Sequence, residues 1–346
     1  MGSWRMPAET DPHERTWMAF PRPNGTLGDT AADAEEAYTA WTAVAHAILE
    51  FEPVTMVVDP VETERARRML SAEVELLEAP LDDFWLRDSG PTFVRNEQDG
   101  LAAVDWVFNG WGAQDWAGWD HDRLLGRLVA EAAGAEVVPS TLVQEGGALH
   151  VDGRGTVFVT ETVQLDPNRN PEATKAAVEA ELARTLGIER TVWLPRGLTR
   201  DYERFGTRGH VDMVLTVPAP GVVLLHQQTD AAHPDFAVTR RLRRVLEEES
   251  DAAGDPWTIV DLPGPARLKD EDGFVDWNYV NHLAVNGGVI ACSYGEADAD
   301  ARARDVLERV YPGRRVVSVE ARPILARGGG IHCITQQQPA TAGVAR

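Results

Sequence analysis

Apolar residues recur along the chain in two alternating patterns, one with the period of a helix and one typical of short strands. Helical spacing runs through residues 29–51, 59–70, 122–134, 170–187, 235–249 and 298–311. Strand-like runs cover residues 53–59, 74–80, 84–94, 103–110, 155–163, 191–195, 221–227, 257–263, 282–294 and 315–325. Because strands and helices alternate throughout, the pattern predicts an α/β fold.

The same pattern indicates the domain organisation, since no Pro/Ser-rich linker or low-complexity block interrupts it. We expect one domain over residues 1–346, ordered from about residue 6 to 339, with a flexible tail at 340–346. The start of the fourth helix is the clearest boundary. Asn170 is expected to cap it, with Pro171 in the first helical position and Glu172 near the positive end of the dipole.

The charge of the chain excludes some partners, since the 346 residues carry a net charge of -22. Such a surface repels nucleic acid and anionic membranes and attracts small cations, although the charge also fits a role in solubility alone. The N-terminus lacks the apolar core of a signal peptide, and no run approaches the roughly 20 apolar residues of a membrane span. Two cysteines cannot build a disulfide framework, so a reducing cytoplasm is the simplest location.

The two cysteines lie in different settings. Cys292, in GGVIACSYG, is expected in a buried strand, whereas Cys333 follows three glycines in RGGGIHCITQQQP and is open to interpretation as a nucleophile, a ligand or a bystander. His332 and Cys333 are adjacent, and in a strand they would project to opposite faces. Four side chains have the chemistry of zinc ligands: His210, Asp212, His332 and Cys333. Their spacing matches no zinc motif, so no metal is expected.

The segment TRGHVDMVLTV contains the most informative spacing in the chain. A strand here would place the apolar side chains from Val211 onward on one face and would place His210 and Asp212 together on the other. Two titratable groups at the start of an apolar strand are costly to bury unless they are paired or used. A polar pair at a surface-facing strand end fits the spacing equally well.

Two carboxylates lie beside glycine-containing turns. Asp88 is expected where the strand in DDFWLRDSGPTFV ends, and ends of strands are where α/β folds place their sites, but turn aspartates are also common. Glu145 precedes two glycines and is a candidate for orienting a histidine. His150, a few residues later, is interpreted as a strand residue rather than a ligand.

The segment WVFNGWGAQDWAGW concentrates tryptophans on a glycine-containing loop, which suggests a wall against an apolar or cationic ligand. Trp106 is instead expected in the core, and the roles of Trp111, Trp116 and Trp119 are left open. The glycines at 328–330 are not a phosphate-binding motif, because they lack the Lys and Ser/Thr of a P-loop and the spacing of a dinucleotide fingerprint.

Each of these signals is weak alone, but their order along the chain is specific. The motifs, in order, are MPAETDPHERTWMAFP, WLRDSGPTFV, FNGWG, EGG, LDPNRNP, GHVD and GGGIHCITQQQP. Together they resemble the agmatine deiminase family, which is similar to the bacterial peptidylarginine deiminases within the guanidine-modifying enzyme superfamily. The resemblance runs from about Met6 to Pro339, and GHVD and the cysteine motif are its most specific parts.

The resemblance implies a fold and an activity. The fold would be a single α/β propeller of five ββαβ modules around a pseudo-fivefold axis, with the site at that axis. The activity would be hydrolysis of a small cationic guanidine, most simply agmatine to N-carbamoylputrescine and ammonia, without a metal or organic cofactor. The family often forms dimers or larger assemblies, so a homo-oligomer is also expected, although no motif decides it.

The resemblance also implies a role for each candidate residue. Cys333 matches the nucleophile, and a nearby cation would favour its thiolate. His210 matches the acid/base, held in position by Glu145. The carboxylates that grip the guanidinium would be Asp88 and Asp212. The other substrate-binding positions would be Trp85, Trp111 and Gly330.

The chain departs from the family pattern beside its histidine. Members often carry an acidic residue where Arg208 stands and Asn where Met213 stands. If Arg208 shared a face with His210, it would bind a substrate carboxylate, and the substrate would then be arginine or a guanidino acid. If Gly209 breaks the alternation of the strand, Arg208 faces solvent, and we favour this second interpretation. The remaining alternatives are a deiminase of free arginine, peptidyl arginine or a biosynthetic intermediate, and a non-catalytic guanidine-binding protein.

Overall fold

The computed structural model describes residues 4–265 and 267–341. Four of its sheets share one order, in which an antiparallel pair is followed by a third strand parallel to the second. Their strands are β4 (Thr92–Arg95), β5 (Leu101–Val107) and β6 (Glu136–Val143); β7 (His150–Val151), β8 (Thr156–Thr160) and β9 (Arg190–Leu194); β10 (Leu215–Ala219), β11 (Val222–Gln227) and β12 (Thr258–Pro263); β15 (Leu283–Val285), β16 (Gly288–Ser293) and β17 (Arg315–Glu320).

A fifth sheet joins the two ends of the chain. Its order is β18-β1-β2-β3, with β1 (His13–Ala19), β2 (Val54–Val58), β3 (Glu75–Glu78) and β18 (Thr335–Pro339). The C-terminal strand β18 runs antiparallel to β1, so that Met18 pairs with Thr335. A separate two-stranded hairpin contains β13 (Lys269–Asp270) and β14 (Gly273–Phe274). The sheet that begins with β1 is therefore completed by the strand that directly follows Cys333.

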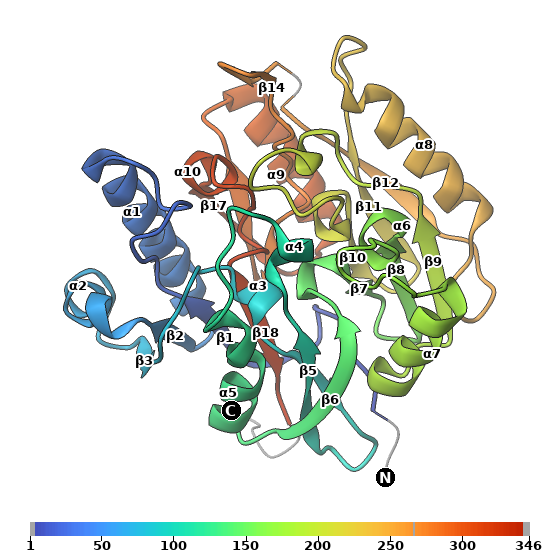
Figure 1. Cartoon of the computed structure of the whole chain (residues 1–346). Helices are drawn as coiled ribbons and strands as arrows, with labels where there is room; N and C mark the ends of the chain where they lie inside the picture. Colours follow the sequence, from blue (N-terminus) through green and yellow to red (C-terminus); the bar gives the residue numbers. More distant parts are fainter. Residues whose placement is uncertain (1–3, 266, 342–346) are drawn as a thin grey trace.

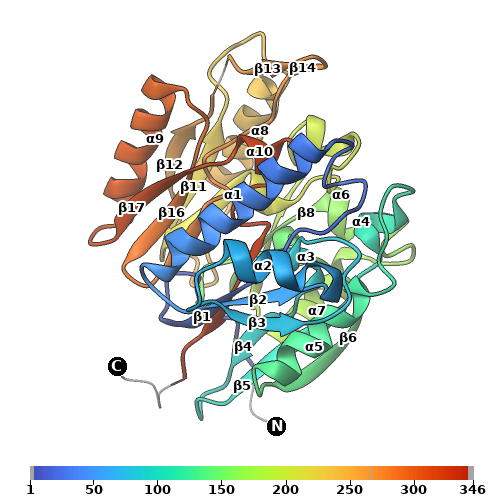
Figure 2. The same cartoon turned by 90° about the vertical axis from the view of Figure 1, so that its left-hand side faces the viewer.

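Each parallel step is made by a helical crossover, as parallel pairing requires. The crossover helices are α1 (Ala31–Leu49), α2 (Thr63–Met69), α5 (Leu125–Ala132), α7 (Lys175–Leu186), α8 (Asp235–Glu248) and α9 (Ala297–Val310). Short helical turns occupy α3 (Leu86–Ser89), α4 (Gly110–Ala113), α6 (Glu161–Gln164), α10 (Arg322–Leu325), η1 (Pro60–Glu62), η2 (Asp122–Leu124), η3 (Gly146–Ala148), η4 (Arg200–Tyr202) and η5 (Val211–Met213). In Figure 1 the helices α1, α5, α7 and α8 lie around the outside, whereas α3 lies near the middle; Figure 2 shows α1 and α2 covering one side.

The fold is thus a mixed α/β domain, as the alternating pattern predicts. All six predicted helices and most predicted strands are present, but the start of the fourth helix was predicted wrongly. The helix begins at Lys175 after the cap Thr174, whose side chain accepts a hydrogen bond from the Ala177 N–H. Asn170 instead uses its side-chain amide to bond both backbone groups of Val143 at the end of β6.

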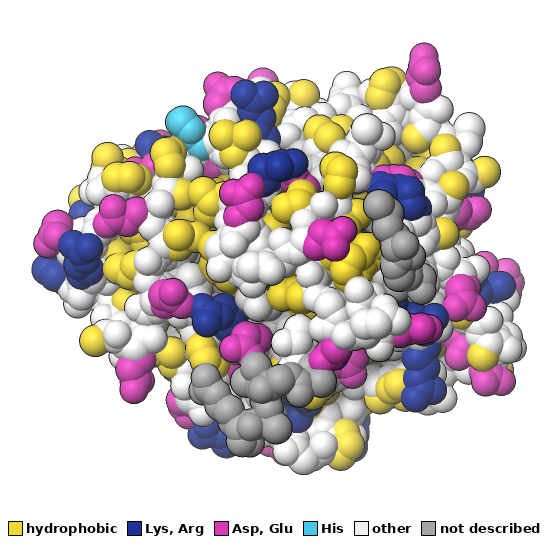
Figure 3. Space-filling model, turned by 90° about the horizontal axis from the view of Figure 1, so that it is seen from below, with side chains coloured by type: hydrophobic (Ala, Val, Ile, Leu, Met, Phe, Trp, Pro, Cys, Tyr) yellow, Lys and Arg dark blue, Asp and Glu magenta, His cyan; other side chains and the backbone are white. Residues whose placement is uncertain are grey.

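Apolar side chains fill the domain in one large cluster and one smaller one. Trp106 lies in the smaller cluster and Cys292 in the larger, both as predicted. No helix in the described part of the chain is long and apolar enough to cross a membrane. On the face shown in Figure 3, acidic and basic side chains are interspersed with apolar ones, so the acidic excess does not form one patch there.

Candidate active site

Cys333 lies in the turn that leads into β18, and its side chain is buried. The Sγ atom lies 3.4 Å from Oδ2 of Asp212 and accepts a 3.1 Å hydrogen bond from Nδ2 of Asn281. Residues 331–334 form a turn rather than a strand. His332 and Cys333 therefore do not diverge, and Nδ1 of His332 contacts the same Asp212 oxygen at 2.8 Å.

The glycines before Cys333 are needed because the chain passes through crowded space. A Cβ placed on Gly329 would lie 2.7 Å from the Trp85 ring and 3.1 Å from the Cys333 sulfur. A Cβ on Gly330 would lie 2.4 Å from Oδ1 of Asn281. Such contacts are far too close for carbon, so a larger residue at either position would displace the thiol or its partner.

His210 and Asp212 do not lie on a strand, and that prediction was wrong. Residues 211–213 form the 3-10 turn η5, and β10 begins at Leu215. The preceding loop wraps around the carboxylate of Asp201, whose Oδ2 accepts hydrogen bonds from the N–H groups of Gly209 and His210. Gly209 has a φ of 119°, which a strand does not allow, so the loop's hydrogen bonds override the apolar alternation.

The predicted groups nevertheless converge on one point beside Gly147. A Cβ on this residue would lie 2.6 Å from Nδ1 of His210 and 2.9 Å from both Oδ2 of Asp212 and Oδ1 of Asp88. The backbone N–H of Gly147 donates a 3.0 Å hydrogen bond to that Asp88 oxygen. Three turns that connect the sheets, α3, η3 and η5, therefore bring a histidine and two carboxylates together, with the thiol next to Asp212.

Asp88 lies in the helical turn α3, not at the end of a strand as predicted. This turn is bonded to the cysteine segment, because the Arg87 N–H donates to the Cys333 carbonyl and Nε of Arg87 donates to the His332 carbonyl. These bonds hold residues 86–89 away from β4, which begins only at Thr92. The turn that carries Asp88 is thereby tied to the turn that carries Cys333.

Trp111 reaches Asp88 from a strained loop. Its Nε1–H donates a 2.8 Å hydrogen bond to Oδ2 of Asp88. The residues from Gly110 to Ala113 all have positive φ values between 54° and 86°, a region that non-glycine residues rarely adopt. The ring is held by stacking on Trp116 at 5.2 Å and by an edge contact with Phe108. Such strain is typical of functional sites, where surrounding contacts maintain it.

Glu145 contacts the histidine as predicted, with Oε2 lying 3.4 Å from Nε2 of His210. The same carboxylate accepts hydrogen bonds of 2.9 and 3.1 Å from Nε of Arg169. Arg169 also donates to Asp166, which completes a buried network. Although burial alone would raise the pKa of Glu145, Arg169 and His210 lower it to about 2, so this carboxylate remains charged.

The charges around His210 set its protonation. Burial opposes a charged imidazole, but Asp88 and Glu145 raise the pKa of His210 to about 9. Burial, and the charges of Asp212 and Glu145, raise the pKa of Asp88 to about 6 despite the opposing effect of His210. Near neutral pH the site therefore holds an imidazolium beside ionised carboxylates.

The same environment disfavours a thiolate at Cys333. Burial and the negative charges of Asp212 and Asp88 raise the pKa of Cys333 well above its ordinary value. Among the described residues, Nδ1 of His210 and Oδ1 of Asp212 are buried without a hydrogen-bond partner. An incoming cation with several N–H groups would neutralise the carboxylates and supply a donor to Oδ1 of Asp212, whereas Nδ1–H of a protonated His210 needs an acceptor.

Three residues of this arrangement escaped the sequence analysis. Asn281 bonds the Cys333 sulfur and also accepts from the His332 N–H, Arg169 holds Glu145, and Glu9 contacts His332. Arg169 and Glu9 belong to motifs quoted for the family resemblance, which was a usable signal, whereas Asn281 belongs to none of them.

Arg208 is not brought beside Cys333 by any described contact. Its guanidinium lies 3.7 Å from Asp166, and its side chain is about one-third exposed. Gly209 does break the alternation of side chains that a strand would have, so Arg208 and His210 do not share a strand face in this loop.

An α/β fold with a buried cysteine, a histidine and paired carboxylates at the meeting of several sheets is the arrangement of a guanidine-modifying enzyme. The sequence profile of the Porphyromonas-type peptidyl-arginine deiminase family matches residues 5–339. The chain belongs to this family.

Individual relatives agree with this assignment. A Streptomyces coelicolor relative is 51% identical over 340 residues, which cover 98% of this chain and 100% of its own length. The agmatine deiminase of Ectopseudomonas mendocina is 40% identical over 365 residues, covering 98% of this chain and 96% of that protein. The solved agmatine deiminase of Enterococcus faecalis has a TM-score of 0.90 at 32% identity, with 97% of this chain and 96% of that chain covered.

Proposed function

We propose that the protein hydrolyses agmatine to N-carbamoylputrescine and ammonia. The observation that carries the proposal is the convergence of His210, Asp212 and Asp88 within 2.6–2.9 Å of one point at Gly147, with the Cys333 sulfur 3.4 Å from Asp212. A guanidinium bound beside Gly147 would meet two carboxylates that match its planar N–H groups, a nucleophile and a proton donor. Similarity to agmatine deiminases supports agmatine as the guanidine.

The reaction follows from the protonation states. The Cys333 thiolate attacks the guanidinium carbon, and the resulting tetrahedral intermediate expels one nitrogen as ammonia after His210 donates a proton to it. A thiouronium remains bound to the sulfur. Neutral His210 then takes a proton from water, and the hydroxide adds to the same carbon. The C–S bond breaks as the added hydroxyl gives up its proton to the departing sulfur, which releases the neutral ureido product and the Cys333 thiol. Water supplies the oxygen, and no redox step occurs.

Substrate binding would itself activate the nucleophile. The pKa of Cys333 is raised in the empty site by burial and by the Asp212 and Asp88 charges. A guanidinium between these carboxylates cancels their effect and places a positive charge near the sulfur, so the thiol loses its proton when the substrate binds. The thiol thus stays protonated, and less reactive, until a cation occupies the site.

An acidic cleft beside the site supports a substrate with a second positive charge. The cleft, of about 490 Å³, borders the site at Met213 and Gly328. Its acidic lining residues are Asp201, Glu203, Asp270, Asp272 and Asp276. Burial, followed by the Asp201 and Asp235 charges, raises the pKa of Asp276 to about 7, so an ammonium group here would be favoured as Asp276 ionises. Agmatine carries such a group at the end of a four-carbon chain.

The carboxylate-bearing alternatives find less support in this cleft. Its two arginines are already engaged, because Arg200 donates a 2.6 Å hydrogen bond to Asp270 and Arg204 lies over the Phe205 ring. Arg208 pairs with Asp166. A substrate carboxylate would therefore meet several acidic groups without a free cationic partner among these three arginines.

The remaining expectations join this proposal. Four sheets share one strand order, and the fifth repeats it from β18 to β2 with β3 added at its edge, which supports a five-module α/β propeller with the site at its centre. A thiol nucleophile and a second free cysteine fit a reducing compartment such as the cytoplasm. No metal or organic cofactor is required by the steps above, and a homo-oligomer remains an expectation from the family.

The test compares turnover of agmatine, arginine, 4-guanidinobutyrate, a peptidyl arginine and butylguanidine, measured as ammonia and ureido product. We expect agmatine to have the highest kcat/KM. In Asp276→Asn, KM for agmatine should rise about tenfold through loss of a charged contact, while KM for butylguanidine, which lacks the ammonium, should not change. Preferential turnover of a carboxylate-bearing guanidine would overturn the choice of agmatine. Binding of guanidines without turnover would instead identify a binding protein.

A further inference from the structure

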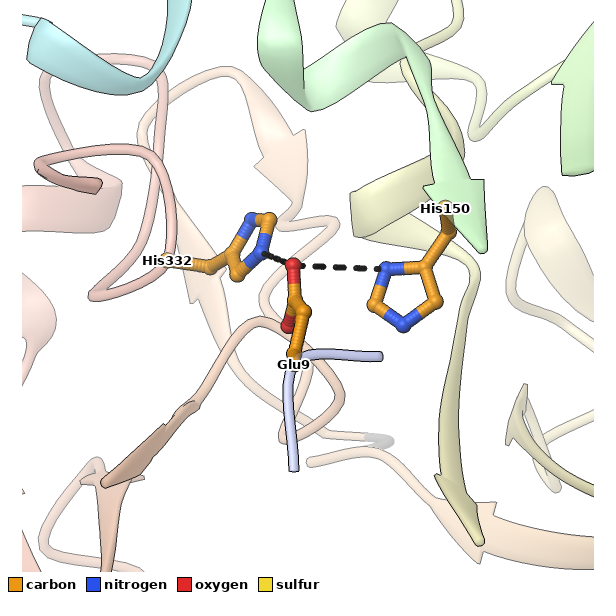
Figure 4. A group of neighbouring side chains, drawn as sticks. All are labelled: Glu9, His150 and His332. Atoms are coloured by element: carbon orange, nitrogen blue, oxygen red, sulfur yellow. Dashed lines mark hydrogen bonds and ion pairs between the residues drawn. The ribbon is translucent and has the colours of Figure 1, made fainter. Parts of the chain in front are cut away.

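A buried chain of contacts continues from Asp212 away from Cys333. Nδ1 of His332 lies 2.8 Å from Oδ2 of Asp212, and Nε2 of the same ring lies 2.7 Å from Oε1 of Glu9. Glu9 precedes β1, so it comes from the opposite end of the chain to the histidine. All three side chains are more than nine-tenths buried. Figure 4 shows the Glu9 carboxylate between the imidazoles of His332 and His150.

The two contacts determine the protonation of His332. Ionised carboxylate oxygens only accept hydrogen bonds, and a neutral imidazole carries one N–H donor. Because both ring nitrogens of His332 face carboxylate oxygens at hydrogen-bonding distance, both must carry hydrogen for the arrangement to be satisfied. Burial and Arg87 oppose this charge, but Glu9 and Asp212 raise the pKa of His332 above its usual value.

The other charged and titratable groups around Glu9, His332 and Asp212 are compatible with a protonated His332 between two ionised carboxylates. The guanidinium of Arg87, from α3, lies 3.6 Å from Oε1 of Glu9. His150, on β7, lies 3.9 Å from that oxygen, but burial lowers its pKa to about 4, so it is neutral. Burial likewise lowers the pKa of His282, which precedes β15, to about 4.

Glu9, His150 and His332 also present three donor atoms within 4.8 Å of one another, a set that resembles a metal site. Two observations disfavour a metal there. The Glu9 oxygen is in direct hydrogen-bond contact with His332, which leaves no space between the two ligand atoms. The positive charge of Arg87 lies beside the same oxygen and would repel a cation.

We propose that Glu9 and His332 are positioning residues that hold Asp212 as a carboxylate: Oδ2, the oxygen beside Gly147 and the Cys333 sulfur, is bonded to His332, and this leaves Oδ1 to accept a hydrogen bond from the substrate guanidinium. Oδ1 is buried and lacks a hydrogen-bond partner among the described residues, as a group reserved for a ligand would. The role in substrate binding rests on the proposed function, whereas the protonation of His332 does not. Glu9 therefore acts on the site through two hydrogen bonds, without touching the reacting atoms.

The first test needs no substrate, and its readout is made on the wild-type protein. Nitrogen NMR of wild-type protein labelled with ¹⁵N-histidine reports the ring protonation of each histidine, and the signals absent from His332→Asn assign His332. We expect both of its ring nitrogens to remain protonated at pH 8, well above the pKa of about 6.5 of an unperturbed histidine. A His332 that is neutral at pH 8 would overturn the proposal.

The second test separates positioning from simple structural support. Glu9→Gln removes the charge that raises the pKa of His332, so His332 should lose its proton as the pH rises through neutrality. Asp212 then loses a charge-assisted hydrogen bond. We expect KM for agmatine to rise about tenfold, with a smaller change in kcat. As the pH is raised, kcat/KM should begin to decline at a lower pH than it does in the wild type.

The matched control is Glu52→Gln. Glu52 is also buried, and its carboxylate lies 3.0 Å from the ring of another buried histidine, His13. Among the described bonds, His13 contacts Glu9 only at its backbone carbonyl, so the Glu9 carboxylate is not involved. The control should retain the wild-type KM and pH profile. Equal effects in the two variants, or no effect in Glu9→Gln, would show that Glu9 is a structural residue and contradict the proposal. If agmatine is not a substrate, the NMR result still decides the state of His332.

Discussion

Arg169 holds Glu145 through its Nε, at 2.9 and 3.1 Å from the two carboxylate oxygens, and both side chains are fully buried. Neither residue touches the guanidinium site directly in the described contacts, yet Glu145 is the partner of Nε2 of His210. His210, the acid/base that we propose, therefore depends on an arginine two contacts away. This dependence can be tested separately from the chemistry at Cys333.

Arg169→Gln is expected to lower the free energy of unfolding by about 3–5 kcal/mol, because it leaves Glu145 as an uncompensated buried charge. The pKa of Glu145, now about 2, should rise. A carboxyl group whose pKa is lower in the folded than in the unfolded protein stabilises the fold at pH values above its unfolded-state pKa. That stabilisation is lost as the pH falls through the folded-state pKa. Because this folded-state pKa should be higher in the variant, the variant should lose stability at a higher pH than the wild type. Denaturant unfolding between about pH 3 and about pH 8 measures both effects.

The control for Arg169 is Arg184→Gln. Arg184 also donates to both oxygens of a glutamate, Glu181, but its side chain is half exposed. A solvent-exposed pair contributes about 0–1 kcal/mol, so this variant should be nearly neutral. Comparable losses in the two variants would contradict the importance that we assign to the buried network.

Trp111→Phe keeps an aromatic ring but removes the hydrogen-bond donor to Asp88. Hydrogen bonds to charged groups contribute about 1.5–3 kcal/mol, so we expect kcat/KM for agmatine to fall at least about tenfold. Because this bond lowers the pKa of Asp88, the acid limb of the kcat/KM profile should move upward from about 6. The basic limb, assigned to His210 at about 9, should remain in place.

Trp106→Phe is the matched control, because Trp106 is also buried and donates through Nε1, but to the hydroxyl of Thr92. It should leave both limbs of the pH profile unchanged. If Trp111→Phe left the acid limb in place as well, Asp88 could not be the group that titrates there.

Gly147→Ala tests the convergence of the site. The added methyl would lie 2.6 Å from Nδ1 of His210 and 2.9 Å from both carboxylate oxygens, in the space assigned to the guanidinium. We expect activity to fall by at least about a hundredfold, corresponding to about 2.7 kcal/mol, while the far-UV circular dichroism spectrum is retained. Gly25→Ala is the control, since nothing lies within 4 Å of its Cβ position. An active Gly147→Ala enzyme would mean that the substrate lies elsewhere.

The net charge of -22 leads to a prediction about ionic strength. A dicationic substrate should be attracted to the acidic cleft, so kcat/KM for agmatine should decrease as salt is added, while kcat at saturating agmatine changes little. Stopped-flow or steady-state rates from low to physiological salt measure this dependence. A flat profile would show that the acidity serves solubility rather than substrate capture.

The sequence predicts the elements of this fold better than the shape of its site. Helices such as 235–249 are recognisable because their apolar stripe survives in the structure. The segments that carry the chemistry break local rules: residues 211–213 leave the strand pattern to satisfy Asp201, and Trp111 adopts a positive φ to reach Asp88. Local sequence cannot reveal these departures, because the partners lie eight or more residues away.

The predicted site residues were assembled by resemblance rather than by spacing. Asp88, Glu145, His210 and Cys333 come from different sheets or the turns beside them, and no local period relates them. The supporting residues were harder to find. Asn281 looks like an ordinary polar residue beside a strand until the turn at Cys333 folds against it, and Glu9 reaches His332 only because β18 pairs with β1.

The most direct measurement is the mass of the protein after rapid acid quenching during agmatine turnover, followed by peptide mapping. The account predicts an adduct equal to agmatine less ammonia on Cys333, absent from Cys333→Ala, which should fold and be inactive. Cys292 serves as the internal control, because burial raises its pKa to about 11, and Cys292→Ser should still form the adduct. Turnover by Cys333→Ala near the wild-type rate, or an adduct on Cys292, would contradict the central claim.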